Sequence, residues 1–460
     1  MVRIIAYTND IVWGAPALVL ILGVGLYLTV RLRAVQVFLF PEAFRLFVKQ
    51  LLPGKGNASF RALCTALAAT VGTGNLVGVA GAICLGGPGA VFWMWVCGLL
   101  GMVTKYAEAL LAVRWRVKTD TGFAGGPMYI IREALPRKFH VLAFLYAAFG
   151  LLASFGVGNA TQINAALTGI RQACRSFGAE LSPLSNLLIT GSLAGIIGAL
   201  LFGGAKAIGK AAEGLIPFAA TGYILLCLGV LCIHWRELPD AFLMIFRGAF
   251  SPKAVTGGLI GSTFRTLRVG CSRGVFTNEA GMGTASIAHA EADGVHPARQ
   301  GLMGIMEVFL DTMVICTMTA LVILVSGVAI PYGTDAGGEL TVRAFSGVYG
   351  SGAAAVLAGA CVLFAVATVL GWGLYGARCG EFLFGSGFWP YFAALQILAV
   401  FAGSFLETGF LWQLSEAVNG LMAIPNLITL ALLAPEAARL TKEYKEPGNT
   451  AGGGTYADFH

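Results

Sequence analysis

Charged residues are scarce in this chain. Only 12% of its 460 residues are Asp, Glu, Lys or Arg, whereas 57% are hydrophobic. Soluble globular domains carry about 25% charged residues, so a set of soluble domains is excluded. The apolar side chains must face lipid instead, and the bilayer is the expected solvent.

Paired cysteines are also lacking. The ten cysteines never form a CxxC motif and lie mostly inside apolar segments, which argues against a disulfide framework and against a metal site. Alternating hydrophobicity is absent as well. The apolar runs are continuous and far longer than the roughly 10 residues of a membrane β-strand, so helices remain.

Ten stretches free of Asp, Glu, Lys and Arg are long enough to cross a bilayer, for which about 20 apolar residues suffice. An eleventh candidate, 255–290, has the same texture but carries several charges, among them Arg273 and Glu279. We therefore expect an all-α polytopic membrane protein with 11 transmembrane helices. The ten uncharged stretches are 11–30, 62–84, 88–104, 139–170, 183–205, 214–233, 312–334, 344–377, 382–406 and 417–435.

Lysine and arginine are unevenly distributed between the connecting segments. With eleven helices, the segments on one side hold 18 Lys and Arg residues and those on the other side hold 7. Basic loops tend to stay in the cytoplasm. We expect a multi-pass protein of the cytoplasmic (inner) membrane with its N-terminus outside and its C-terminus cytoplasmic. The same bias accounts for the net charge of +7 without nucleic acid.

The helices after the first divide into two groups of five. Because five is odd, the second group must cross the membrane upside down, as in inverted-repeat transporters. We expect an N-terminal helix with a cytoplasmic loop at 1–58, five-helix repeats at 59–233 and 255–435, and a cytoplasmic tail at 436–460. The connecting segment from Trp235 to Phe250 is either an interfacial helix or a plain loop.

The opening helix of each repeat is interrupted near its middle. The first break reads VGTGN at 71–75, and the second reads FTNEAGMG at 276–283. Glycine costs about 1 kcal/mol in a helix interior relative to alanine, and unpaired backbone groups in lipid cost several more. A break offers freed N–H groups to a carboxylate and freed carbonyls to a cation. The alternative is that the glycines only allow close helix packing.

At these residues the chain resembles a known family, the alanine or glycine:cation symporters, whose members adopt the leucine-transporter fold with one extra N-terminal helix. The likeness covers nearly the whole chain and rests on long, specific motifs. They are ATVGTGN (69–75), LGGPGAVFWMWV (85–96), TKYAEALLAVRWR (104–116), GGPMYI (125–130), GGAKAIGKAAEGLIPF (203–218), RGVFTNEAGMGTASIAHA (273–290), HPARQG (296–301), LGWGLYG (370–376) and NGLMAIPNL (419–427).

The resemblance implies a substrate site between the two breaks, with the backbone of Thr73 and Gly74 facing the substrate carboxylate. It also implies that the carbonyls of Ala68 and Val71 and the hydroxyl of Thr368 hold sodium as the coupling ion, with no organic cofactor. Eight positions match residues that line the family's substrate site: Thr73, Gly74, Asn75, Gln162, Phe276, Thr277, Thr368 and Trp372.

One position departs from the family's pattern. The family usually has Ser or Thr immediately before the position of Thr368, whereas this chain has Ala367. The change removes a potential oxygen ligand. Either a water or another carbonyl completes the sodium shell, or the coupling ion differs.

Charged residues inside the expected helices have ordinary interpretations too. Lys105 and Glu108 are three apart on one helix and are expected to pair. Glu307 and Asp311 are four apart; solvation near the cytoplasmic end is the expectation, and a nearby proton or cation is the alternative. Glu279 is expected to hold the second break open, with neutralisation by its neighbour on the same segment as the alternative.

The segment HAEADGVH at 289–296 contains His289, Glu291 and His296. Its spacing matches no established zinc signature, so a hydrophilic cytoplasmic loop is expected rather than a metal site.

The sequence predicts a secondary active symporter that imports a small neutral amino acid, alanine or glycine, with sodium by alternating access. A proton-coupled amino-acid permease of the same fold is the alternative, with Glu279 as its titratable group. A membrane-embedded enzyme is disfavoured because no nucleophile and base pair lies at membrane depth. A channel is disfavoured because the breaks are two single features. The expected partners are the amino acid and the lipid bilayer, with no obligatory protein partner.

Overall fold

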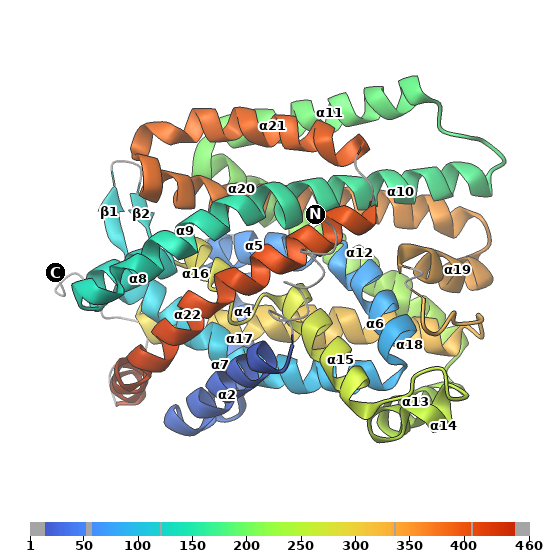
Figure 1. Cartoon of the computed structure of the whole chain (residues 1–460), viewed down its shortest axis with the longest axis horizontal. Coiled ribbons are helices and arrows are strands. Elements are labelled where there is room, and N and C mark those ends of the chain that lie inside the picture. Colours follow the sequence, from blue (N-terminus) through green and yellow to red (C-terminus); the bar gives the residue numbers. More distant parts are fainter. Residues whose placement is uncertain (1–13, 52–57, 120–121, 335–336, 406–407, 447–460) are drawn as a thin grey trace.

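The computed structural model describes residues 14–51, 58–119, 122–334, 337–405 and 408–446. Most of these residues are helical, and the only strands among them are β1 (Val117–Thr119) and β2 (Gly122–Ala124), which form one antiparallel pair. In Figure 1 the long helices run along the longest axis of the molecule, and the two strands lie at one end.

Helix starts and ends follow local sequence signals. Helix α11 begins at Pro183, after Ser182, whose hydroxyl accepts the N–H of Ser185 at 3.1 Å. Helix α20 ends at Phe384 and is followed by Gly385, which has a φ of 92°. The helices up to residue 233 are α2 (Ala15–Arg31), α3 (Val35–Phe38), α4 (Phe40–Leu51), α5 (Ala58–Thr70), η1 (Gly74–Gly78), α6 (Val79–Gly86), α7 (Gly89–Arg114), α8 (Pro127–Ala134), η2 (Arg137–Phe139), α9 (His140–Phe155), η3 (Gly156–Ala160), α10 (Thr161–Ser176), α11 (Pro183–Phe202) and α12 (Gly204–Ile233).

The remaining chain continues the helical pattern to its last described residues. Its helices are α13 (Leu238–Phe250), α14 (Pro252–Val255), α15 (Thr263–Asn278), α16 (Thr284–His289), α17 (Pro297–Val308), η4 (Phe309–Cys316), α18 (Thr317–Val325), α19 (Gly337–Tyr349), α20 (Gly352–Phe384), η5 (Ser386–Phe388), α21 (Trp389–Phe405) and α22 (Thr408–Lys445).

Within the described ranges, eight helical runs are long and apolar enough to cross a membrane, and the bent pair of α5 and η1–α6 makes a ninth. Helix α2 is apolar but has only 17 residues, and α15 carries three arginines. These two would bring the total to eleven, so that number stays a prediction. The molecule is a polytopic all-α membrane protein.

Several helices run past the predicted uncharged stretches because their charged residues are buried and bonded to polar groups. Helix α7 continues beyond residue 104 through Lys105 and Glu108, which are fully buried. Helix α20 continues beyond residue 377 through Arg378, whose guanidinium lies 2.9 Å from Glu381 and 3.1 Å from Glu291. A partner close in space but far along the chain makes such a charge tolerable in a helix.

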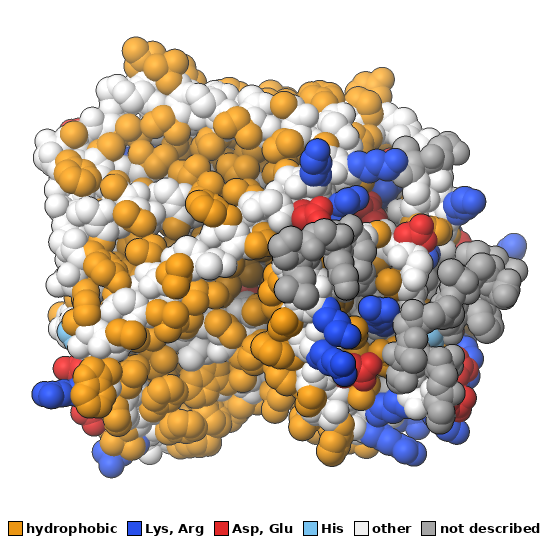
Figure 2. Space-filling model, turned by 180° about the vertical axis from the view of Figure 1, so that it is seen from behind, with side chains coloured by type: hydrophobic (Ala, Val, Ile, Leu, Met, Phe, Trp, Pro, Cys, Tyr) orange, Lys and Arg blue, Asp and Glu red, His pale blue; other side chains and the backbone are white. Residues whose placement is uncertain are grey.

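The surface has the character of a lipid-facing belt. Figure 2 shows hydrophobic side chains over the broad middle of one face, with Lys and Arg gathered at the end that carries β1 and β2 in Figure 1. Large apolar side chains such as Val19, Phe218 and Leu398 are more than half exposed. Soluble proteins rarely expose apolar surface on this scale.

The segment from Trp235 to Phe250 contains helix α13, so its interpretation as a plain loop is wrong. The helix packs on α7, where Gly89 and Gly248 come so close that a Cβ on Gly89 would lie 2.0 Å from the Gly248 carbonyl carbon. Phe246 and Phe250 meet the Phe92 ring edge to face, with centroids 5.8 and 5.3 Å away. An amphipathic helix held by aromatic contacts suits a membrane interface.

Candidate functional site

The first break separates α5 from η1, and the axis bends there by 48°. The Asn75 side chain stabilises the break, because its Oδ1 accepts the Gly72 N–H at 2.9 Å. In the described part of the chain, the N–H group of Thr73 has no hydrogen-bond acceptor. The first break therefore presents a backbone donor to a ligand.

The second break separates α15 from α16 and is built from left-handed backbone. Glu279, Gly281 and Gly283 have φ values of 55°, 91° and 77°. Such a conformation is uncommon for a residue with a side chain. The Glu279 carboxylate is fixed in place, since it accepts the Thr284 hydroxyl at 2.6 Å and the Trp372 indole N–H at 2.8 Å. These bonds agree with the expectation that Glu279 holds the break open.

The two breaks lie next to each other. A Cβ on Gly74 of the first break would be 3.5 Å from the Thr277 methyl group and 3.9 Å from the Phe276 ring. Phe276 and Thr277 immediately precede Asn278, the last residue of α15 before the second break. Two interrupted helices thus meet at one place in the fold, as the sequence predicted.

Three of the predicted site residues form one cluster around the first break. The Thr73 hydroxyl donates to Gln162 Oε1 at 2.7 Å. A Cβ on Gly72 would lie 2.5 Å from the Thr368 hydroxyl oxygen and 3.6 Å from Gln162 Oε1. Side chains from the break, α10 and α20 therefore converge beside Gly72.

The predicted sodium ligands come from the end of α5 and from α20, which pack against each other. Ala68 and Val71 are buried at the end of α5, and Gly371 of α20 packs against the Ala69 backbone, where a Cβ would be 2.8 Å from the Ala69 nitrogen. The Thr368 hydroxyl is buried and has no hydrogen-bond partner in the described part of the chain. An oxygen left without a partner beside freed carbonyls fits a cation ligand.

Trp372 is placed differently from the other site residues. The Trp372 ring is fully buried, and its N–H donates to Glu279. A Cβ on Gly158 would lie 2.3 Å from the Trp372 Cβ. The tryptophan therefore links α20 to the second break and packs on η3. It is therefore not a belt residue at the lipid headgroups, where the tryptophans of membrane proteins concentrate.

Asp311 lies at the candidate site, although the sequence analysis did not include it among the site residues. It is fully buried, so solvation near the cytoplasmic end is wrong. Asn75 Nδ2 donates to its Oδ1 at 2.6 Å, and the Thr312 hydroxyl donates to its Oδ2 at 2.8 Å. Both the oxygen and the nitrogen of the Asn75 amide therefore bond to protein groups, and Asn75 joins the first break to a buried carboxylate. A single Asp inside an otherwise apolar helix was the available signal.

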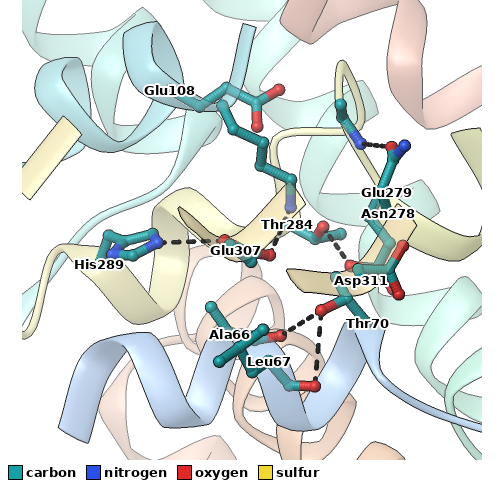
Figure 3. Close-up of polar contacts among 12 residues, drawn as sticks. Ala66, Leu67, Thr70, Glu108, Asn278, Glu279, Thr284, His289, Glu307 and Asp311 are labelled. Carbon is teal, nitrogen blue, oxygen red and sulfur yellow. Dashed lines mark hydrogen bonds and ion pairs between the residues drawn. The ribbon is translucent and has the colours of Figure 1, made fainter. Parts of the chain in front are cut away.

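A chain of buried polar groups lies beside the second break. Lys105 Nζ and Glu307 Oε1 are 2.8 Å apart, and His289 Nε2 lies 3.2 Å from the other Glu307 oxygen. Gln300 joins His289 at 2.6 Å and accepts the Ser59 hydroxyl at 2.6 Å. Lys105 therefore bonds to Glu307 rather than to Glu108. Figure 3 shows His289 and Glu307 joined, with Glu108, Glu279 and Asp311 around them.

The segment HAEADGVH does not gather its acidic and histidine residues. His289 is buried on α16, Glu291 pairs with Arg378, and His296 Nδ1 accepts the Ala298 N–H at the start of α17. Its first residue is thus part of the buried network rather than of a hydrophilic loop. Burial raises the pKa of Glu291, although Arg378 opposes the shift, and burial lowers the pKa of His296.

The polar site residues lie in or just after π-helical turns. Asn75 is in η1, Gln162 follows η3 by two residues, and Asp311 is in η4. π-Helical turns are rare and occur often at functional sites. Three of them around one pair of broken helices mark this region as the functional centre.

We expect Gly72→Ala to lower transport about tenfold, because the new methyl group would be 2.5 Å from the Thr368 hydroxyl and forced displacement of packed groups costs about 1–3 kcal/mol. Initial uptake rates in proteoliposomes measure the effect. Gly78→Ala is the matched control, since its Cβ would meet Thr277 at an ordinary 3.7 Å. Equal rates for the two variants would contradict the close approach of Gly72 and Thr368.

Known proteins match this chain over nearly its whole length. A family described as the sodium:alanine symporter family matches residues 1–453. The sodium/alanine symporter AgcS of Methanococcus maripaludis is 42% identical over 454 residues, 97% of each chain. The probable sodium/glutamine symporter GlnT of Bacillus subtilis is 35% identical over 446 residues, 96% of this chain and 90% of that protein.

Among solved structures, MhsT in complex with L-phenylalanine is similar with a TM-score of 0.54 and 13% sequence identity. The similarity covers 83% of this chain and 97% of MhsT. At this identity the match concerns the fold, which is the leucine-transporter fold.

Proposed function

Because this chain belongs to the sodium:alanine symporter family and is an amino-acid:cation symporter rather than an enzyme, we propose that it imports a small neutral amino acid, alanine or glycine, together with sodium. The observation that carries the proposal is the meeting of the two breaks, with the Thr73 N–H group available beside Gly72 and Thr368.

The amino acid's carboxylate would bind the N–H groups of Thr73 and Gly74. Gln162, Thr277 and Phe276 would surround the rest of the molecule, with Asn75 and Trp372 holding the two breaks in position. Thr277 and Phe276 lie beside the first break, since a Cβ on Gly74 would make ordinary contacts with them at 3.5 and 3.9 Å. Sodium would take the carbonyls of Ala68 and Val71 and the hydroxyl of Thr368.

Coupling to one sodium ion supplies enough energy for accumulation. Movement of one charge through about 100 mV yields roughly 2.3 kcal/mol, and a tenfold gradient adds about 1.4 kcal/mol. Together they support roughly 500-fold accumulation of a zwitterion by alternating access. The basic end in Figure 2 supports an orientation in the cytoplasmic membrane with that end, and the C-terminal tail, in the cytoplasm.

The deciding experiment is uptake of alanine, glycine, serine and glutamine into proteoliposomes, with a sodium gradient, a proton gradient or neither. We expect alanine and glycine to accumulate to levels at least about tenfold higher with inward sodium, because a driving force of about 1.4 kcal/mol corresponds to a tenfold concentration ratio. Uptake that follows the proton gradient without sodium would instead support the proton-coupled permease, and uptake of none of the four would reject the substrate class.

A further inference from the structure

The second break contains an anion-binding nest that is already occupied. The N–H groups of Gly281 and Gly283 both point at one oxygen, Oε1 of Glu108 on α7, at 3.0 and 3.1 Å. The left-handed φ values of the two glycines turn their N–H groups to the same side. Backbone concavities of this kind bind anions, and here the anion is a carboxylate of the same chain.

Asn426 on α22 completes the nest. Its Nδ2 donates to Glu108 Oε1 at 2.7 Å and to the Gly281 carbonyl at 2.9 Å. A Cβ on Gly283 would lie 2.3 Å from Pro127 and 2.7 Å from Asn426. The nest is therefore tightly packed on the side that Pro127 and Asn426 form.

Glu108 is held by dipoles rather than by a bonded cation. The nearest lysine along α7, Lys105, is bonded to Glu307 at 2.8 Å. Glu108 Oε1 instead accepts three N–H donors, and Glu108 is fully buried. Charge-assisted bonds of this kind are about twice as strong as neutral ones, so the carboxylate fixes the backbone of the second break firmly.

The first break is the opposite case. There the amide of Asn75 caps only the Gly72 N–H, and the Thr73 N–H has no acceptor in the described part of the chain. The first break thus offers a backbone donor to a ligand, while the donors of the second break that face Glu108 are filled internally.

We propose that Glu108 is a positioning residue that occupies the anion site of the second break and thereby reserves the first break for the carboxylate of the transported amino acid. The inference rests on the proposed function for its last step only. It predicts that a variant without the Glu108 carboxylate has an empty nest, which binds a small carboxylate from solution.

The test removes the resident carboxylate and supplies it from solution. Full-length Glu108→Ala is expected to lose about tenfold or more of its sodium-driven alanine uptake, because two buried backbone donors lose their acceptor. Formate, added as its choline salt at millimolar concentration, is expected to restore part of the uptake and to raise the melting temperature of purified Glu108→Ala. Formamide, which has the same size but no charge, is expected to do neither.

Two comparisons keep the result decisive. Glu108→Gln fills the nest with a neutral oxygen, so its uptake should fall. Formate should leave the melting temperature of Glu108→Gln unchanged. This variant also provides a test if Glu108→Ala does not fold. Wild-type uptake in Glu108→Gln, or equal effects of formate and formamide on Glu108→Ala, would overturn the proposal. The melting measurement needs no transport, so inactivity of the wild type towards alanine would reject the proposed function and leave the anion site standing.

Discussion

Asn75→Asp is expected to abolish sodium-dependent uptake at neutral pH, with initial rates at least about 100-fold below those of the parent protein. The substitution would put a second carboxylate where Asn75 Nδ2 now lies, 2.6 Å from Asp311 Oδ1 in a fully buried place. Two buried carboxylates at this distance cannot both be ionised, so they separate or share a proton. Either outcome displaces the residue that caps Gly72 in the first break.

The control for this prediction is Asn75→Ala, which removes the same hydrogen bonds without adding charge. We expect it to retain more uptake than Asn75→Asp and to lose about 1–3 kcal/mol of stability, the cost of leaving a buried group unsatisfied. Lower pH should partly restore Asn75→Asp, because a shared proton replaces the missing N–H donor, and should leave Asn75→Ala unaffected. Equal rates for the two variants across pH would contradict the repulsion argument.

Lys105→Met is expected to lower the free energy of unfolding by about 3–5 kcal/mol. Lys105 and Glu307 are both essentially inaccessible to solvent, and their 2.8 Å contact joins α7 to α17. Removal of one partner leaves an uncompensated buried charge, which is costlier than the pair itself is stabilising. Denaturant unfolding of the purified protein in detergent measures the loss.

Removal of both partners should cost less than removal of one. We expect Lys105→Met combined with Glu307→Met to recover more than half of the lost stability, since no charge is then left behind. The exposed pair Arg61–Glu213, at 3.2 Å with the arginine side chain 43% exposed, is the matched control. Arg61→Met should cost under about 1 kcal/mol. Additive losses in the double variant would show that Lys105 and Glu307 do not act as a pair.

The helical membrane architecture could be predicted because lipid leaves few alternatives to continuous apolar helices. The breaks were visible for the same reason: VGTGN and FTNEAGMG put polar and flexible residues where helices otherwise avoid them. Helix ends were predicted less well. One predicted helix ended at residue 104 because the stretches were required to be free of charged residues. Glu307, the partner that makes Lys105 tolerable in the helix, lies 202 residues further along the chain.

The resemblance to the symporter family groups Thr73, Gln162 and Thr368, and the structure brings these three residues together. Their role in binding the substrate stays a prediction. Asn75 was assigned to the substrate, yet both ends of its amide bond to the protein. Which way a side chain points after a π-helical turn depends on backbone geometry that composition does not reveal, so Asp311 could not be joined to Asn75 in advance.

The π-helical turns also make the spacing of residues as important as their identity. Each wide turn accommodates an extra residue, and one residue rotates everything that follows by about 100° around the helix axis. Loss of a single residue from η4 would swing the side chains beyond it away from the broken helices without altering the character of the sequence. A one-residue gap at η1, η3 or η4 would therefore be a stronger sign of a remodelled site than many conservative replacements elsewhere.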